Sequence, residues 1–199
     1  DDVLVLVGDL LEKGEQSLDT LRYIIELTKT LTVYALCGNC DHIDRVFLEG
    51  RPGADEDLLP VFRFWKERWL IAQMGAELGM GLGKPEDLPE LRRAVLEHFP
   101  EECDFILNLP HILVAGSFIF VHGGISRENR LEELDAYGCM KDDDFLGQGY
   151  SFKKWVVVGH WPVTLYHPDI PIARPLVETK RHIISIDGGC VLKLDGQLN

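Results

Sequence analysis

Residues 3–14 read Val-Leu-Val-Leu-Val-Gly-Asp-Leu-Leu-Glu-Lys-Gly, and this sequence is the clearest indication of the fold class. Its first five residues are valine or leucine, a run typical of a strand that is buried on both faces. The strand ends in Gly8-Asp9, which places a carboxylate at the carboxyl edge of a sheet, where open α/β sheets bind ligands. Gly8 permits a tight turn, and Gly14 is expected to close the loop before a helix. Taken alone, the stretch fits an ordinary strand-to-helix loop equally well.

The composition excludes several classes of partner. The chain has 199 residues, with 33 acidic against 20 basic side chains and a formal net charge of -13. An acidic protein with scattered charges is not expected to bind a nucleic-acid backbone or an anionic membrane. No apolar run reaches membrane-spanning length. Five cysteines at irregular spacing fit a reducing compartment, so a cytoplasmic location is expected.

Both ends of the sequence look truncated. The chain starts at Asp1 without a methionine and enters a buried-type strand at once. It stops just after Asp195-Gly196, which is typical of a hairpin turn before a return strand. We therefore expect residues 1–199 to form one domain that lacks a segment at each end.

A strand-helix-strand unit follows the first strand. Ser17 is a candidate N-cap, and apolar residues recur at helical spacing through residue 28. Residues 31–36 then read as a second strand, which predicts a parallel pair. Directly after it come Cys37-Gly38-Asn39-Cys40-Asp41-His42, a second group of polar side chains at a strand end.

Residues 43–110 are expected to form a helical insertion within the domain. A long helix is predicted for residues 58–78, and two more for residues 85–99 and 101–107. Pro89 falls in the first turn of the second of these helices, where proline is tolerated. The aromatic residues of the first helix are interpreted as core, not as a stacking surface. These residues are Phe62, Phe64, Trp65 and Trp69.

The sheet pattern returns after the insertion. Residues 111–121 predict a hairpin with its turn at 115–117, and it runs into His122-Gly123-Gly124. The acidic stretch 128–144 is expected to be helix and loop with a solvated face. Further strands are predicted at residues 155–158, which precede Gly159-His160, and at 182–186 and 190–194. The pattern predicts an α/β fold.

Four predicted strands thus end in polar groups beside glycine. These groups are Asp9, Asn39, His122 and His160. One histidine near a strand is usually a satisfied core residue, but four such strand ends in one chain indicate a shared site. Mixed oxygen and nitrogen donors suit manganese, iron, zinc or nickel better than calcium. We expect the four side chains to converge within ligand distance of one point, with a second hydrogen-bond partner fixing each histidine ring.

These blocks resemble those of the calcineurin-like metallophosphoesterases, most closely the branch of serine/threonine protein phosphatases and symmetrical diadenosine tetraphosphatases. Residues 8–14 are similar to the GD-x-x-D-R-G block, 38–41 to G-N-H-E, and 121–124 to V-H-G-G. Residues 159–160 match the G-H block, and 186–191 are similar to I-D-T-G-C-V. The resemblance implies a sandwich of two mixed β-sheets flanked by helices, and a phosphoester hydrolase with two divalent metal ions, Mn²⁺ foremost.

The resemblance also implies roles for single residues. Asp9 would bridge the two metals, and Asn39, His122 and His160 would complete the protein ligands of the second. Asp41 joins these four as a catalytic candidate. The dinuclear site would activate a water for in-line attack on phosphorus.

Two lysines stand where the family has phosphate-binding arginines. Lys13 takes one such place, next to Glu12 where the family has aspartate, and Lys141 takes the second in a looser alignment. Because lysine cannot make the bidentate contact of arginine, both changes should loosen the orientation of phosphate.

Further departures concern the acid and the first metal. Cys40 stands where protein phosphatases have the histidine that protonates the leaving oxygen, although some bacterial phosphodiesterases of the superfamily carry G-N-C-D. Asp187 is interpreted as structural and not catalytic. The Asp-x-His block that begins the family pattern is missing, so the chain as written is expected to hold one metal tightly, a second at most weakly, and to turn over slowly.

Two other functions stay open. A phosphatase-like scaffold that only binds partners is favoured by the missing block, by Cys40 and by the lysines. A redox or zinc module could use the C-x-x-C of Cys37 and Cys40, although it needs a second close cysteine pair for zinc. For the hydrolase, the substrate could be a phosphoprotein, a dinucleoside polyphosphate or a small phosphoester.

Overall fold

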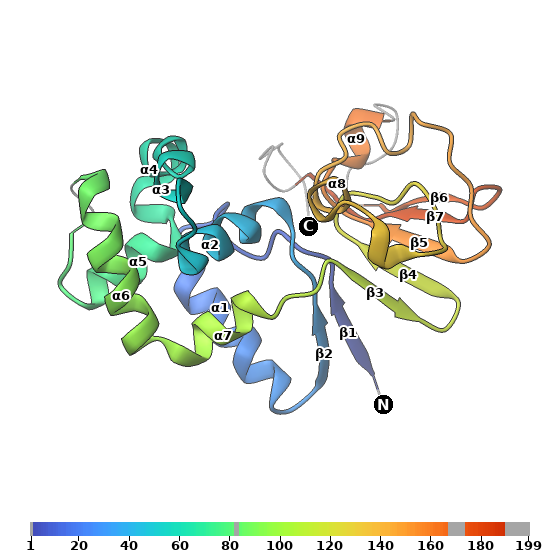
Figure 1. The fold of residues 1–199 in the computed structure, drawn as a ribbon. Helices are drawn as coiled ribbons and strands as arrows, with labels where there is room; N and C mark the ends of the chain where they lie inside the picture. Colours follow the sequence, from blue (N-terminus) through green and yellow to red (C-terminus); the bar gives the residue numbers. More distant parts are fainter. Residues whose placement is uncertain (1, 82–83, 167–173, 190–199) are drawn as a thin grey trace. The chain divides into compact units, whose positions relative to one another are not determined.

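The computed structural model describes residues 2–81, 84–166 and 174–189 (Figure 1). The chain divides into two compact units. The helical unit comprises Asp1–Leu4, Leu10–Tyr34 and Cys40–Leu109, and the sheet unit comprises Val5–Asp9, Ala35–Asn39 and Pro110–Asn199. Strands β1 (Val3–Leu6) and β2 (Thr32–Ala35) pair with each other, and each runs from residues of the helical unit into residues of the sheet unit.

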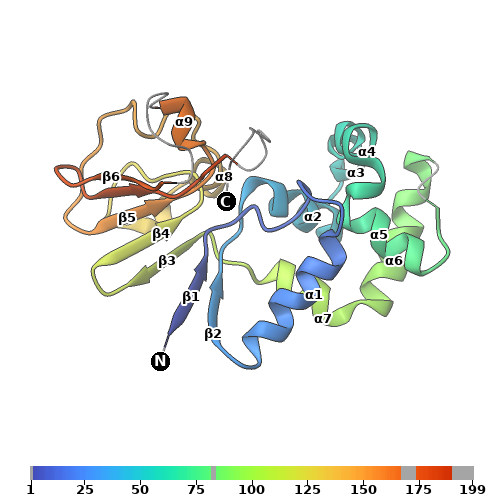
Figure 2. The ribbon, with the colours of Figure 1, turned by 180° about the vertical axis from the view of Figure 1, so that it is seen from behind.

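The helical unit packs its helices around one apolar core. Its helical segments are α1 (Ser17–Thr28), α2 (Asn39–Glu49), α3 (Ala54–Asp57), α4 (Leu59–Trp65), η1 (Lys66–Arg68), α5 (Leu70–Glu77), η2 (Pro85–Asp87), α6 (Leu88–His98) and α7 (Pro100–Leu107). Helix α1 contacts α5 and α7, and α6 contacts the same two helices (Figure 2). The core between them includes Leu21, Trp69, Ile71 and Met74, none of which is exposed.

Helix α1 forms where the sequence predicts a helix, but Ser17 is not its N-cap. The helix includes Ser17, and its N-cap is Gln16, which makes no capping hydrogen bond. The Ser17 hydroxyl accepts a hydrogen bond from the Glu12 amide (3.1 Å) and donates to the Arg68 carbonyl (3.2 Å). Ser17 therefore joins the loop after β1 to the end of η1 instead of capping its own helix.

The long helix predicted for residues 58–78 is broken into α4, η1 and α5. The break falls at Lys66, whose φ of 48° lies in the left-handed region that ends a helix. The interpretation of the aromatic residues as core is right for Trp69, which is fully buried, and wrong for Phe64, which is 82% exposed. Phe64 lies in α4, before the break, whereas Trp69 lies after it.

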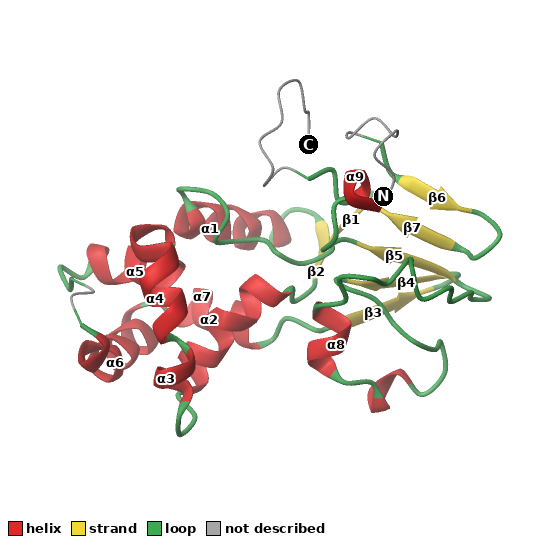
Figure 3. Cartoon of the chain, turned by 90° about the horizontal axis from the view of Figure 1, so that it is seen from above, coloured by secondary structure: helices red, strands yellow, loops and turns green. Residues whose placement is uncertain are grey.

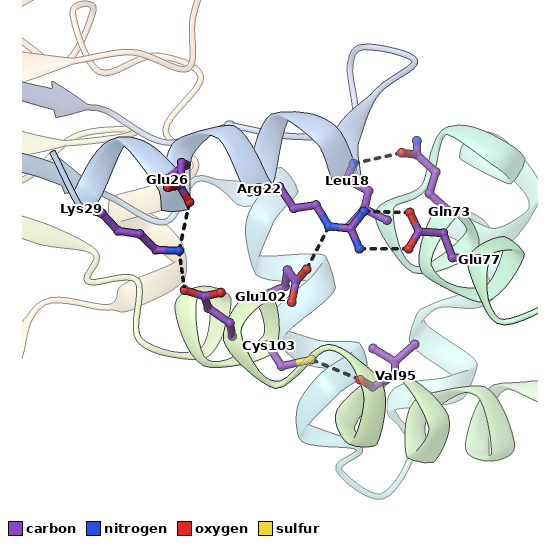
Figure 4. A network of polar contacts seen from close by, with 10 residues as sticks. Leu18, Arg22, Glu26, Lys29, Gln73, Glu77, Val95, Glu102 and Cys103 are labelled. Carbon is purple, nitrogen blue, oxygen red and sulfur yellow. Dashed lines mark hydrogen bonds and ion pairs between the residues drawn. The ribbon is translucent and has the colours of Figure 1, made fainter. Parts of the chain in front are cut away.

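An exposed ionic network also links helices of this unit (Figure 4). Arg22 of α1 donates to both carboxylate oxygens of Glu77 on α5, at 2.8 and 2.9 Å, and to Glu102 on α7 at 3.1 Å. Lys29 bridges Glu26 and Glu101 in the same way. Since Arg22 and Glu77 are more than 40% exposed, solvent screens the pair and its contribution to stability is small.

The sheet unit contains a five-stranded mixed sheet. Its strands are β3 (Ile112–Ala115), β4 (Phe118–Val121), β5 (Trp155–Val158), β6 (Leu176–Glu178) and β7 (Ile183–Ser185), in the order β3-β4-β5-β7-β6 (Figure 3). The pairs β4-β5 and β5-β7 are parallel, whereas β3-β4 and β6-β7 are antiparallel. Short helical segments η3 (Leu131–Glu133), α8 (Ala136–Met140) and α9 (Val163–Tyr166) lie between the strands in sequence.

Strands β3, β4, β5 and β7 of the sheet unit lie within the residue ranges that the sequence predicts. The hairpin forms with Ile112 opposite Val121 and Ala115 opposite Phe118, and β5 spans the predicted residues 155–158. The strand predicted for residues 190–194 lies outside the described residues. Helix α2 was not predicted, because a polar block opens it. The α/β class is confirmed, with a five-stranded mixed sheet beside helices, whereas the single domain with an insertion at 43–110 stays a prediction.

Candidate metal centre

Asp9 and His122 form the nucleus of the candidate site. His122 Nε2 lies 3.3 Å from Asp9 Oδ1, and the His122 ring is almost fully buried. The other ring nitrogen, Nδ1, lies 2.7 Å from the Val7 carbonyl, which can only accept a hydrogen bond. Nδ1 therefore donates its proton to this carbonyl, and in a neutral ring the Nε2 lone pair faces a carboxylate oxygen. A cation between these two acceptors would stabilise them, so the pair fits a metal ion chemically.

Glycines allow the strand ends to approach this closely. Gly8 has φ of +83°, and a Cβ there would lie 2.8 Å from His122 Nδ1. A Cβ at Gly38 would lie well inside van der Waals contact of the Asp9 amide and carboxylate. Each glycine thus leaves room for a neighbouring side chain of the site, as the pattern of polar groups beside glycine predicts.

His160 lies beside this pair at the end of β5. Its ring centroid is 5.2 Å from that of His122, edge to face, and the Gly159 amide donates to the His122 carbonyl at 2.9 Å. His160 Nε2 is 2.6 Å from Asp143 Oδ1. Burial lowers the pKa of His160, while the Asp143 hydrogen bond opposes that shift. Both histidine rings thus have a second hydrogen-bond partner of the kind that metal-bound histidines usually have, and their role as metal ligands stays a prediction.

Asn39 is the fourth candidate ligand. It opens α2, is half-buried, and directly follows the glycine that lies against Asp9. Within residues 2–81, 84–166 and 174–189, however, no three His, Cys, Asp or Glu side chains already form a cluster that could hold a metal ion. The convergence of all four ligands on one point therefore stays a prediction.

The remaining site candidates fall in different units. Asp41 is fully buried in the helical unit, where it accepts a hydrogen bond from the Leu10 amide at 2.9 Å. Lys13 is exposed in the loop of the same unit. Lys141 belongs to the sheet unit, and its Nζ lies 3.4 Å from Asp143 Oδ1. The last contact brings one predicted phosphate-binding lysine next to the partner of His160.

The structure adds contacts of acidic residues that the sequence did not predict. Asp143 stood in an acidic stretch interpreted as solvated, and only its folded position reveals the contact with His160. Glu12 and Asp44 are both buried and hydrogen-bonded to each other. Burial raises the pKa of Glu12 to about 7, and burial also holds the pKa of Asp44 well above its usual range, with the charge of Glu12 as the next cause.

Asp187 makes a local hydrogen bond and the described cysteines are buried, while the interpretation of Asp187 as structural stays a prediction. The Asp187 carboxylate accepts a hydrogen bond from the Gly189 amide at 2.7 Å, and burial raises its pKa. Cys37, Cys40, Cys103 and Cys139 are all buried thiols. Thiol exchange requires an accessible thiolate, so the burial of Cys37 and Cys40 weighs against the redox alternative.

None of the helices that the structure describes is both long and apolar enough to cross a membrane.

Comparison with known proteins identifies the family of the chain. The chain is 25% identical over 207 aligned residues to a bis(5'-nucleosyl)-tetraphosphatase PrpE, described as asymmetrical, from Bacillus velezensis. The alignment covers 96% of this chain and 71% of that protein. Residues 1–185 match the sequence profile of calcineurin-like phosphoesterases. The chain therefore belongs to the calcineurin-like phosphoesterase family, and its chemistry is that of a phosphoester hydrolase.

Proposed function

We propose that the protein is a metal-dependent phosphoester hydrolase whose metal site is built on Asp9 and His122. The observation that carries this proposal is the 3.3 Å approach of His122 Nε2 to Asp9 Oδ1, for which Gly8 and Gly38 leave room. Such a pair costs free energy unless a cation or a proton lies between its members.

The ligands proposed for the metal are Asp9, Asn39, His122 and His160. Divalent ions bound there, Mn²⁺ foremost and two in a dinuclear site, would supply an activated water and neutralise charge that develops on phosphate. Val7 holds the His122 ring through Nδ1, so that ring needs no reorientation to present Nε2. Asp41 would contribute by fixing the loop that begins at Leu10, through its buried hydrogen bond.

The substrate proposed first is a dinucleoside polyphosphate. The support is the Bacillus velezensis relative, which is named for hydrolysis of bis(5'-nucleosyl) tetraphosphate. Lys13 and Lys141 are proposed to bind the phosphate groups as point charges. A phosphoserine or phosphothreonine protein and a small phosphoester are the other substrates to test. Four buried thiols support a location in the reducing cytoplasm.

A comparison of three substrates with and without Mn²⁺ tests this proposal. Diadenosine tetraphosphate, a phosphothreonine peptide and p-nitrophenyl phosphate would be offered to the wild type, to His122→Asn and to His98→Asn. His98 is an exposed residue of α6 and serves as the matched control. We expect Mn²⁺-dependent turnover that falls at least 100-fold in His122→Asn and is retained in His98→Asn. Bound metal without turnover of any phosphoester would instead favour the partner-binding scaffold.

A further inference from the structure

We propose that Asp143 is a positioning residue for His160, which holds the imidazole in the tautomer that leaves Nδ1 available to the metal ion. The inference deepens the proposed function and rests on it. Asp143 lies 17 residues before His160 in sequence, in an acidic loop, and not in any of the motifs that carry the family resemblance.

The contact itself defines the tautomer. His160 Nε2 and Asp143 Oδ1 are 2.6 Å apart, a short distance typical of charge-assisted hydrogen bonds. An ionised carboxylate can only accept, so Nε2 must donate its proton. In a neutral ring the remaining lone pair is then on Nδ1. His122 shows the opposite assignment, with Nδ1 donating to Val7 and Nε2 directed at Asp9, so the two histidines would offer different nitrogens.

His160 combines an unusual backbone conformation with a nearly buried side chain. Its φ is +62°, in the left-handed region that non-glycine residues rarely adopt. The side chain is 8% exposed, whereas that of Asp143 is 50% exposed. The nearly buried ring is therefore contacted by a carboxylate that is itself half exposed.

Asp143 lies in a turn that is held by side-chain hydrogen bonds of the neighbouring residue. The neighbouring Asp142 carboxylate accepts hydrogen bonds from the Asp144 amide (3.1 Å) and from the Gln148 side chain (2.9 and 3.0 Å). The start of the turn packs on the loop after His122, where a Cβ at Gly123 would lie 2.8 Å from the Lys141 amide. The turn is thus anchored to the same strand end that provides His122.

Lys141 contacts the same carboxylate that accepts the hydrogen bond from His160. Its ammonium is 3.4 Å from the Asp143 oxygen that accepts from His160. The order is cation, carboxylate and imidazole, so one carboxylate places both a candidate metal ligand and a candidate phosphate-binding lysine. A negative partner on Nε2 also makes Nδ1 a stronger donor to a metal, as carboxylate-histidine pairs do in other metal sites.

Four variants test the inference on the whole protein. Asp143→Asn and Asp143→Ala remove the anionic acceptor, and Asp143→Glu restores a carboxylate one methylene further out. Asp144→Asn makes the same charge change at the next exposed position of the turn and serves as the control. Two properties would be measured: the tautomer of His160, by long-range proton-nitrogen NMR of the metal-free protein, and the affinity for Co²⁺, by calorimetry.

The expected results separate a positioning role from a structural one. Wild type, Asp144→Asn and Asp143→Glu should show the Nε2-protonated tautomer of His160, and Asp143→Asn and Asp143→Ala a mixture. Co²⁺ affinity should fall about 10–100-fold in the latter two variants and less than twofold in the control. An unchanged tautomer and an unchanged affinity in Asp143→Asn would overturn the inference. Wild-type protein that neither binds metal nor hydrolyses a phosphoester would instead refute the proposed function, whatever the tautomer.

Discussion

Gly38 is the residue whose replacement tests the packing of the site most simply. A Cβ at this position would overlap the amide and carboxylate of Asp9, so Gly38→Ala must displace Asp9 or the start of α2. Overpacking of this kind costs about 1–3 kcal/mol of unfolding free energy, and Mn²⁺ affinity should fall with it. Gly14→Ala is the control, because a Cβ there meets nothing within 4 Å. Equal stability and metal affinity in the two variants would contradict this geometry.

Replacement of Lys13 tests whether this side chain binds phosphate. Because the lysine is exposed in the loop that follows Asp9, Lys13→Ala should leave stability within about 0.5 kcal/mol of wild type. If it binds substrate phosphate, KM and the inhibition constant of inorganic phosphate should both rise several-fold. The comparison variant is Lys153→Ala, which removes an exposed lysine of the sheet unit. Identical phosphate inhibition in both variants would remove Lys13 from the site.

Within the helical unit, the Glu12-Asp44 pair joins three segments. Glu12 lies in the loop after β1 and accepts a hydrogen bond from the Leu70 amide at the start of α5, at 3.0 Å. Asp44 lies on α2 and accepts from the Trp69 indole at 2.8 Å. Asp41 and Lys13 are the other charged groups that act on Glu12, with opposite effects on its pKa. Two buried carboxyl groups in contact favour one shared proton, because both cannot ionise cheaply.

This pair predicts a pH dependence of stability. The pKa of Glu12 is raised to about 7 in the folded protein, so between about pH 4.5 and pH 7 the folded state binds more protons than the unfolded state. The stabilisation is fully present below pH 4.5 and is lost as pH rises through 7, by about 1–3 kcal/mol. Glu12→Gln stays neutral and should lose the share of this pH dependence that Glu12 contributes, whereas Glu67→Gln, an exposed control, should keep all of it. Urea unfolding at pH 5 and pH 8 measures how much the free energy of unfolding changes between the two pH values. An equal change in wild type and Glu12→Gln would refute this role of Glu12.

Helix α1 allows burial to be compared with ion pairing at neighbouring positions. Leu21 is fully buried in the helical core, so Leu21→Ala should cost about 2–5 kcal/mol. Arg22→Ala removes the contacts with Glu77 and Glu102, but their exposure limits the cost to about 1 kcal/mol or less. Thermal or urea unfolding of both variants checks the order, and an Arg22 effect larger than that of Leu21 would show that the ionic network dominates.

Across the whole molecule, the sequence predicted what depends on local pattern. Apolar periodicity is enough for α1, alternating and β-branched residues are enough for the β3-β4 hairpin and β5, and strand ends beside glycine are enough for the Asp9-His122 pair. The break at Lys66 escaped prediction because an apolar pattern continues across it. Asp143 escaped because an acidic residue in an acidic loop gives no local sign of the histidine it contacts. Tertiary contacts decide such cases, and periodicity does not report them.

We expect the strand ends around Asp9 and His122 to hold a divalent metal ion. Anomalous diffraction from crystals grown with Mn²⁺ measures this directly, because the signal identifies both the metal and its position. We predict an anomalous peak within about 2.0–2.3 Å of Asp9 Oδ1 and His122 Nε2, with Asn39 and His160 as further ligands. A fully occupied Mn²⁺ elsewhere on the protein, with Asp9 and His122 still in direct contact and no peak between them, would contradict it.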